Sequence, residues 1–140
     1  MPEEEVIYGA DNDNQELLKN LKIMTYNIHA ANPPSKSGVC DLAAIARVIN
    51  GANPDVVMLQ EVDKNTGRND YFGNQAKELG ELTKMNSLFF PAISYKKGYY
   101  GVAVLSRYPL YSSELHRLPK EKGEEQRVLG TAWADLPGED

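Results

Sequence analysis

One carboxylate in this sequence stands where many enzymes place a functional group. The apolar run Val56–Leu59 ends in Gln60-Glu61, and only Asp55 separates it from the break Asn53-Pro54. An unalternating apolar run with two valines is typical of a strand covered on both faces. A carboxylate directly after such a run stands at the carboxyl end of the strand, where open α/β folds bind ligands. For an arbitrary strand, however, a residue such as Glu61 simply solvates the strand end, because most charged residues lie at the surface.

The elements around this run bring a second polar residue to the same edge. Leu21–Ile28 is rich in β-branched and aromatic residues and predicts a strand. Asp41 predicts the N-cap of a helix that Asn50-Gly51 ends. A strand, a helix and the strand Asp55–Glu61 make a right-handed crossover, so the two strands are parallel and end on the same edge. We therefore expect Asn27 and Glu61 to face one crevice.

The remaining chain predicts one more helix and then a series of strands. The second helix is capped by Asp70, and Gly73 and Gly80 weaken it. Its predicted apolar stripe consists of Phe72, Ala76, Leu79, Leu82 and Met85. Strands are predicted over 88–93 and 101–105, with a turn around 96–98, and over 111–118 and 128–136. This order predicts an α/β (α+β) fold of sheets flanked by helices rather than a simple doubly wound sheet.

Composition limits the class of protein. A chain of 140 residues with 41% hydrophobic content suits one domain, which we place at 21–140 behind an acidic tail at 1–20. The net charge of -5 disfavours a nucleic-acid-binding module without chemistry. The single cysteine, Cys40, permits no internal disulfide and is expected to fill space at the start of a helix. Neither a signal peptide nor a transmembrane segment is evident, so we expect a soluble chain, cytoplasmic by default with secretion as the alternative.

Four sequence blocks stand out beyond these elements. They are Met24-Thr25-Tyr26-Asn27-Ile28-His29, Asn53–Val62, Gly98–Arg107 and Gln126-Arg127-Val128. With these blocks the chain resembles the endonuclease/exonuclease/phosphatase superfamily, which has a DNase I-like fold of two packed sheets flanked by helices. The blocks occur in the family's order, and the resemblance covers nearly everything after residue 20.

The resemblance implies a metal-dependent hydrolase of phosphate esters. Glu61 matches a glutamate that binds Mg²⁺ in the family, with Mn²⁺ as an alternative ion. Asn27 matches an asparagine that helps to hold the metal, the attacking water or the phosphate. Magnesium takes one or two carboxylates and leaves its other positions to water and substrate phosphate. Gln60 is expected to orient Glu61. The implied partner is a phosphate ester, which could be a nucleic acid, an inositol phosphate or a phospholipid headgroup.

Later motifs of the family have no match in this sequence. The family's Thr-His strand, its Gly-Asp-x-Asn block and its closing Asp-His pair are missing, and the two histidines are His29 and His116. The chain therefore resembles roughly the first half of a catalytic domain, and we expect it to be inactive alone. The alternative is a non-catalytic, truncated or pseudoenzyme chain that self-associates through exposed edge strands.

Three basic side chains are candidates for contact with substrate. His29 follows the Asn27 strand end and could touch a phosphate, although a structural role is equally expected. Arg68 lies in the loop beyond Glu61 and could reach the crevice. Arg127 could pair with phosphate, but the stronger expectation is that it anchors the start of a strand through carboxylates.

Overall fold

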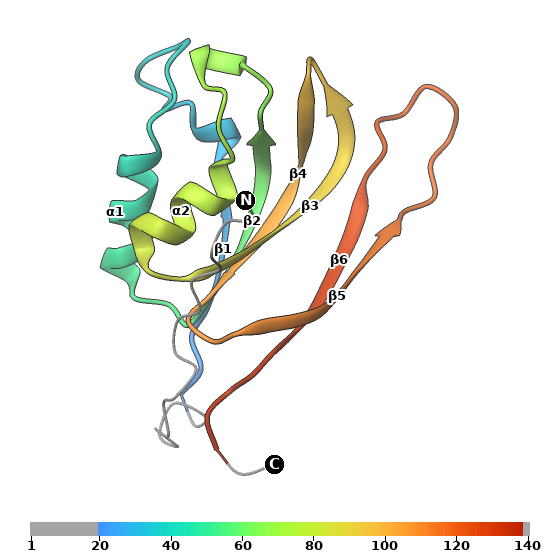
Figure 1. Ribbon diagram of the computed structural model, residues 1–140. Coiled ribbons are helices and arrows are strands. Elements are labelled where there is room, and N and C mark those ends of the chain that lie inside the picture. The colour runs from blue at the N-terminus through green and yellow to red at the C-terminus, as the bar shows by residue number, and fades with distance from the viewer. Residues whose placement is uncertain (1–19, 139–140) are drawn as a thin grey trace, which may run out of the picture.

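The computed structural model describes residues 20–138. The predicted acidic tail at 1–20 therefore lies outside the described residues except for Asn20, and the boundary at residue 20 stays a prediction. Within the described part, two helices, a four-stranded sheet and a two-stranded sheet form successive layers (Figure 1). No helix in residues 20–138 has the length and apolar character needed to cross a membrane.

The four-stranded sheet has the order β1-β2-β4-β3. Its strands are β1 (Ile23–Asn27), β2 (Val56–Lys64), β3 (Asn86–Tyr95) and β4 (Gly98–Ser106). β1 and β2 are parallel, as the strand–helix–strand pattern predicts, whereas β4 is antiparallel to both of its neighbours. The turn predicted around 96–98 falls at Lys96-Lys97, between β3 and β4.

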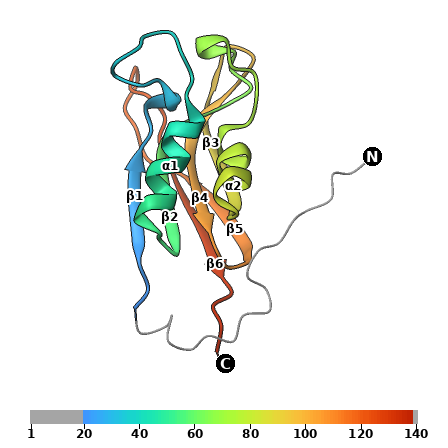
Figure 2. The same cartoon turned by 90° about the vertical axis from the view of Figure 1, so that its left-hand side faces the viewer.

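Two helices, α1 (Leu42–Ala52) and α2 (Gln75–Thr83), lie side by side on one face of this sheet (Figure 2). Asp41 caps α1 as predicted, and its side chain accepts a hydrogen bond from the Ala44 amide at 3.0 Å. The left-handed residue Asn53 ends the helix. The prediction that Asn50-Gly51 ends α1 is wrong, because Gly51 still makes helical backbone and the helix tolerates it at a cost of about 1 kcal/mol.

The predicted start of α2 is also wrong. Asp70 has a left-handed backbone and lies in a short turn, and Asn74 caps the helix by accepting a hydrogen bond from the Lys77 amide. The later start removes Phe72 from the predicted stripe, and its side chain is 72% exposed. Leu82 faces solvent as well, whereas Leu79 is completely buried.

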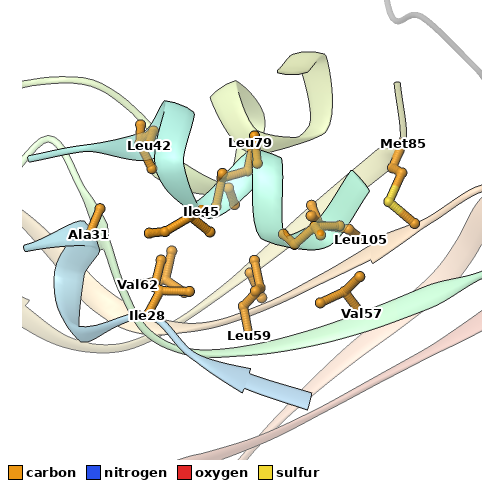
Figure 3. Close-up of a cluster of buried hydrophobic side chains, with 14 residues drawn as sticks. Ile28, Ala31, Leu42, Ile45, Val57, Leu59, Val62, Leu79, Met85 and Leu105 are labelled. Atoms are coloured by element: carbon orange, nitrogen blue, oxygen red, sulfur yellow. The ribbon is translucent and has the colours of Figure 1, made fainter. Parts of the chain in front are cut away.

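The hydrophobic core fills the space between the two helices and the four-stranded sheet (Figure 3). Val57, Leu59 and Val62 of β2 are buried toward the helices, whereas Met58 between them is 45% exposed on the other face. The prediction that this strand is covered on both faces is therefore wrong at Met58. Cys40 is half-buried beside this core, and burial raises the pKa of its thiol, in keeping with the predicted space-filling role. Buried aliphatic side chains of this core include Ile45, Ile49, Val57, Leu59, Val62, Leu79 and Leu105.

The opposite face of the sheet is covered only in part. β5 (Leu110–Arg117) and β6 (Val128–Ala134) form an antiparallel pair that packs over β3 and β4. Gly130 lies against the Phe90 ring, where an added Cβ would come within 2.5 Å of the ring carbons. On the β1–β2 side of this face, Ile23 is 56% exposed and Met58 is 45% exposed. In the described part of the chain β6 pairs with β5 alone, so its other edge is open.

Candidate active site

β1 and β2 bring Asn27 and Glu61 to the same end of the sheet. Asn27 lies opposite Gln60 in the parallel register, and the Ile28 amide donates a hydrogen bond to the Gln60 carbonyl at 3.0 Å. Glu61 is the next residue of β2. The loop after β1, the segment after β2 and the β3–β4 hairpin all lie at this end (Figure 1).

Glu61 does not stand at the end of its strand, contrary to the prediction from the apolar run. β2 continues to Lys64, and Glu61 lies in a bulge where the register with β4 shifts between Leu59 and Val62. The backbone of Glu61 is left-handed there, with φ of 57°. Because a bulge turns a side chain out of the regular alternation, it re-aims Glu61 away from the direction that its position in the strand would give.

Glu61 lines a polar pocket of about 170 Å³. The turn His29–Ala31, which follows β1, contributes one wall, and Asn27 supports that turn by accepting a hydrogen bond from the His29 amide at 3.0 Å. Asn27 itself is exposed and does not line the pocket. The lining residues are His29, Ala30, Asn32, Glu61, Arg68, Asn69 and Tyr100.

Backbone strain is concentrated around this pocket. Four of its seven lining residues, His29, Ala30, Glu61 and Asn69, have φ between 50° and 57°. Residues other than glycine avoid this left-handed region unless the surrounding structure holds them there, and such strain clusters at functional sites.

Arg68, a candidate for this crevice, does line the pocket, but two of its side-chain hydrogen bonds hold it to Asp63. Its Nε and Nη2 donate to the Asp63 carboxylate at 2.8 and 2.7 Å. Its guanidinium lies 4.4 Å from the ring centroid of Tyr95 and 5.1 Å from that of Tyr100. The hydrogen bonds with Asp63 raise the pKa of Arg68 above its ordinary value, so it is a permanent cation beside Glu61.

Tyr100 is a pocket residue that was not among the predicted site residues. Burial, followed by the charge and the hydrogen bond of Glu61, raises the pKa of Tyr100 to about 12. Its hydroxyl therefore stays protonated at neutral pH and remains a hydrogen-bond donor. The local sequence does not place Tyr100 at the pocket, because its position depends on the β2–β4 register, in which Tyr100 lies opposite Asp63.

Gln60 and Arg127 lie apart from the pocket lining. The Gln60 side chain donates to Thr25 Oγ1 at 3.1 Å and to the Met58 carbonyl at 3.2 Å, and none of its hydrogen bonds within residues 20–138 goes to Glu61. Arg127 is exposed and pairs with Glu125 at 3.4 Å just before β6, in line with a role at the strand start. The charge of Glu125, the partner of Arg127, is one of the causes that raise the pKa of Tyr100.

The donor set fits only part of a magnesium site. Mg²⁺ accepts carboxylate oxygen and keeps several positions for water and phosphate, and the Glu61 carboxylate in a polar pocket provides one such ligand. Nowhere in residues 20–138 do three or more histidine, cysteine, aspartate or glutamate side chains converge around a common point. The His116 side chain is exposed on β5 and pairs with Glu114.

Solved structures with this fold are longer than the chain. An endonuclease/exonuclease/phosphatase from Beutenbergia cavernae matches 84% of this chain and 35% of its own, with 31% identity and a TM-score of 0.69. A family protein from Leptotrichia buccalis matches 83% and 49% with 20% identity and a TM-score of 0.60. A mannosyl-6-phosphatase from Bacteroides thetaiotaomicron matches 79% and 44% with 15% identity and a TM-score of 0.56.

The chain thus spans about a third to a half of the length of these proteins. Among curated protein sequences, none matches the chain. The model of the endonuclease/exonuclease/phosphatase family matches residues 24–138, which include every lining residue of the pocket and all six strands except the first residue of β1. The layered fold, the four sequence blocks and this match lead to one conclusion: the chain belongs to the endonuclease/exonuclease/phosphatase family.

Proposed function

We propose that this chain supplies one part of the active site of a magnesium-dependent phosphoesterase, with Glu61 as its metal ligand. The observation that carries the proposal is the placement of the Glu61 carboxylate, on a strained bulge, in a polar pocket beside the Asn27-supported turn. When bound, the metal would polarise the phosphoryl oxygen and neutralise developing charge.

Asn27 and His29 have complementary roles in this proposal. The Asn27 side-chain oxygen holds the His29 amide, which leaves its NH₂ group to donate to phosphate or water. His29 Nδ1 lies 3.3 Å from the Asn32 carbonyl oxygen. Because a carbonyl can only accept, Nδ1 is the donor there, and in the neutral ring Nε2 is left as an acceptor. The charge of Arg68 is paired with Asp63, so its remaining N–H groups, rather than a net positive charge, would contact an anionic substrate.

We further propose that the chain by itself does not turn over substrate. A single carboxylate and an amide leave most magnesium positions without a protein ligand, and none of the residues in the pocket lining is a carboxylate-oriented histidine that could act as a base. The substrate is a phosphate ester, with nucleic acid, inositol phosphate and phospholipid headgroup as the candidates.

Metal binding and hydrolysis test this proposal separately. Mn²⁺ binding is measured by electron paramagnetic resonance on the wild type, Glu61→Gln and the control Glu81→Gln, an exposed residue of α2. Binding should be weak, lost in Glu61→Gln and retained in the control. Equal binding by all three proteins would refute Glu61 as a ligand. Metal-dependent cleavage of a nitrophenyl phosphate mono- or diester, lost in Glu61→Gln, would refute the proposed inactivity.

A second candidate function is a non-catalytic chain that associates with another copy. The open edge of β6 and the exposed apolar residues Ile23, Met58 and Trp133 favour it, because an unpaired strand edge is a template for pairing. Sedimentation velocity over a wide range of protein concentration tests it. A defined oligomer with no Glu61-dependent metal binding would support this function over the first, whereas a monomer would exclude it.

A further inference from the structure

Gln75, the first residue of α2, is a buried polar residue that the proposed chemistry does not use. It is 1% exposed. Buried polar groups in folded proteins have specific hydrogen-bond partners, because an unpaired group loses its contacts with water and gains nothing in return. Gln75 Oε1 accepts a hydrogen bond from the Asp63 backbone amide at 2.9 Å, and Gln75 Nε2 donates to the Ala30 carbonyl at 2.8 Å.

These two partners determine which way the Gln75 amide faces. A backbone N–H can only donate and a backbone carbonyl can only accept, so Oε1 faces Asp63 and Nε2 faces Ala30. Nε2 also contacts Cys40 Sγ at 3.5 Å. The amide of Gln75 is therefore fixed in position and in orientation.

The two partners belong to different parts of the pocket. Ala30 lies in the His29–Ala31 turn and lines the pocket itself. Asp63 lies on β2 beyond the bulge that carries Glu61, and its carboxylate binds the lining residue Arg68. One side chain of α2 therefore connects the turn after β1 with the strand that carries the proposed metal ligand.

This connection lies where the regular pairing of β1 with β2 has ended. The last pair in the register is Asn27 opposite Gln60, whereas β2 continues to Lys64. The turn after β1 has left-handed backbone, and β2 is bulged at Glu61, so the regular register holds neither segment in place. The Gln75 amide bonds to both segments and takes the place of a rung between the strands.

We infer that Gln75 is a positioning residue that fixes the separation between the His29–Ala31 turn and the bulge at Glu61, and thereby raises the affinity of the pocket for a divalent cation. The inference rests on the proposed function, since it concerns the metal ligand named there. Segments that are held in place before an ion arrives pay less of the ordering cost of binding. Groups that orient the ligands of a metal typically contribute 10- to 100-fold to its affinity.

Two substitutions test the chemistry and the length of this side chain separately. Gln75→Met keeps a similar length but removes both hydrogen bonds. Gln75→Asn keeps the amide on a stem that is one methylene shorter, so the amide cannot reach both partners at once. We expect each variant to weaken Mn²⁺ binding, measured by electron paramagnetic resonance, by about 10-fold.

Leu79→Ala is the matched control, because Leu79 is completely buried on the same helix and does not line the pocket. This variant loses stability without touching the connection between the two segments. It should bind Mn²⁺ with wild-type affinity at a temperature where all the proteins are folded. An equal loss of affinity in Leu79→Ala would show that Gln75 acts only through stability and would overturn the inference.

Nuclear magnetic resonance of the metal-free chain gives a second test that does not depend on the ion. The side-chain NH₂ protons of Gln75 should exchange slowly with solvent in the wild type, and fast exchange would overturn the inference without any variant. The backbone amide resonances of Ala30 and Glu61 should shift or broaden in both Gln75 variants and stay in place in Leu79→Ala. Unchanged resonances in the Gln75 variants would also overturn the inference.

The outcomes separate this inference from the proposed function. If Glu61→Gln abolishes Mn²⁺ binding while both Gln75 variants retain wild-type affinity, Glu61 remains the ligand and the positioning role is refuted. If Glu61→Gln leaves Mn²⁺ binding unchanged, the proposed function fails, and the resonances of the metal-free chain still decide whether Gln75 fixes the two segments.

Discussion

Arg68→Ala should destabilise the folded chain strongly even though Arg68 lies at a pocket. The Asp63 side chain is 2% exposed and receives two of its hydrogen bonds from this guanidinium, with a third from Thr66 at 2.9 Å. Removing one partner of a buried ion pair typically costs about 3–5 kcal/mol, because the other charge is left uncompensated. The Arg68 side chain is 30% exposed, so water offsets part of this loss. The loss of the packing on Tyr95 and Tyr100 adds about 0.5–1 kcal/mol.

We therefore expect a loss of about 3 kcal/mol in the free energy of unfolding. Urea unfolding followed by circular dichroism measures it, with Arg47→Ala, an exposed arginine of α1, as the control that should change stability by no more than about 0.5 kcal/mol. The double variant Asp63→Asn/Arg68→Ala should be more stable than Arg68→Ala alone, since it removes the unpaired charge. A loss below about 1 kcal/mol for Arg68→Ala would refute the reasoning, because surface ion pairs show that value.

Three further predictions follow from packing and from the pocket. Gly101→Ala would press a Cβ into the Phe90 carbonyl oxygen of the neighbouring strand β3, whose register with β4 shifts between Pro91 and Ile93. We expect a loss of about 3 kcal/mol in the free energy of unfolding, measured by urea unfolding. Leu79→Ala should cost about 3 kcal/mol in the same assay, whereas the exposed Leu82→Ala should change stability by about 0.5 kcal/mol at most. The pKa of Tyr100 is raised from 10.0 to about 12 in the folded chain, so stability should fall as pH rises from about 10 to about 12. Tyr100→Phe should remove part of that loss, and an unchanged pH profile in this variant would contradict it.

Local sequence signals were sufficient for the first strand–helix–strand unit. Asp41 predicts the start of α1 because its short carboxylate can cap free backbone amides, and the structure shows this hydrogen bond. The run Val56–Leu59 predicts a strand, and the structure shows it, with Val57 and Leu59 buried under the helices and Met58 45% exposed on the other face. The predicted parallel pairing of the two strands is confirmed, and it places Asn27 opposite Gln60.

Features that depend on partners distant in sequence were beyond such signals. The bulge at Glu61 arises from the register between β2 and β4, strands that the prediction did not pair. Asp70 has the composition of a helix cap, but Asn74 is the cap in the structure, with Asp70 in the preceding turn. Arg68 was a candidate for substrate contact. Its bidentate pair with Asp63 depends on how the loop after β2 folds, which the local sequence does not indicate.

The left-handed backbone at Glu61 sets stability against the proposed role of its carboxylate as a metal ligand. A residue with a Cβ costs about 1–2 kcal/mol more in this conformation than glycine does, and asparagine tolerates it better than glutamate. Selection of random variants for heat resistance alone should therefore replace Glu61 by glycine or asparagine and discard the carboxylate. Selection for hydrolysis in a complete enzyme should keep glutamate there and accept a lower melting temperature.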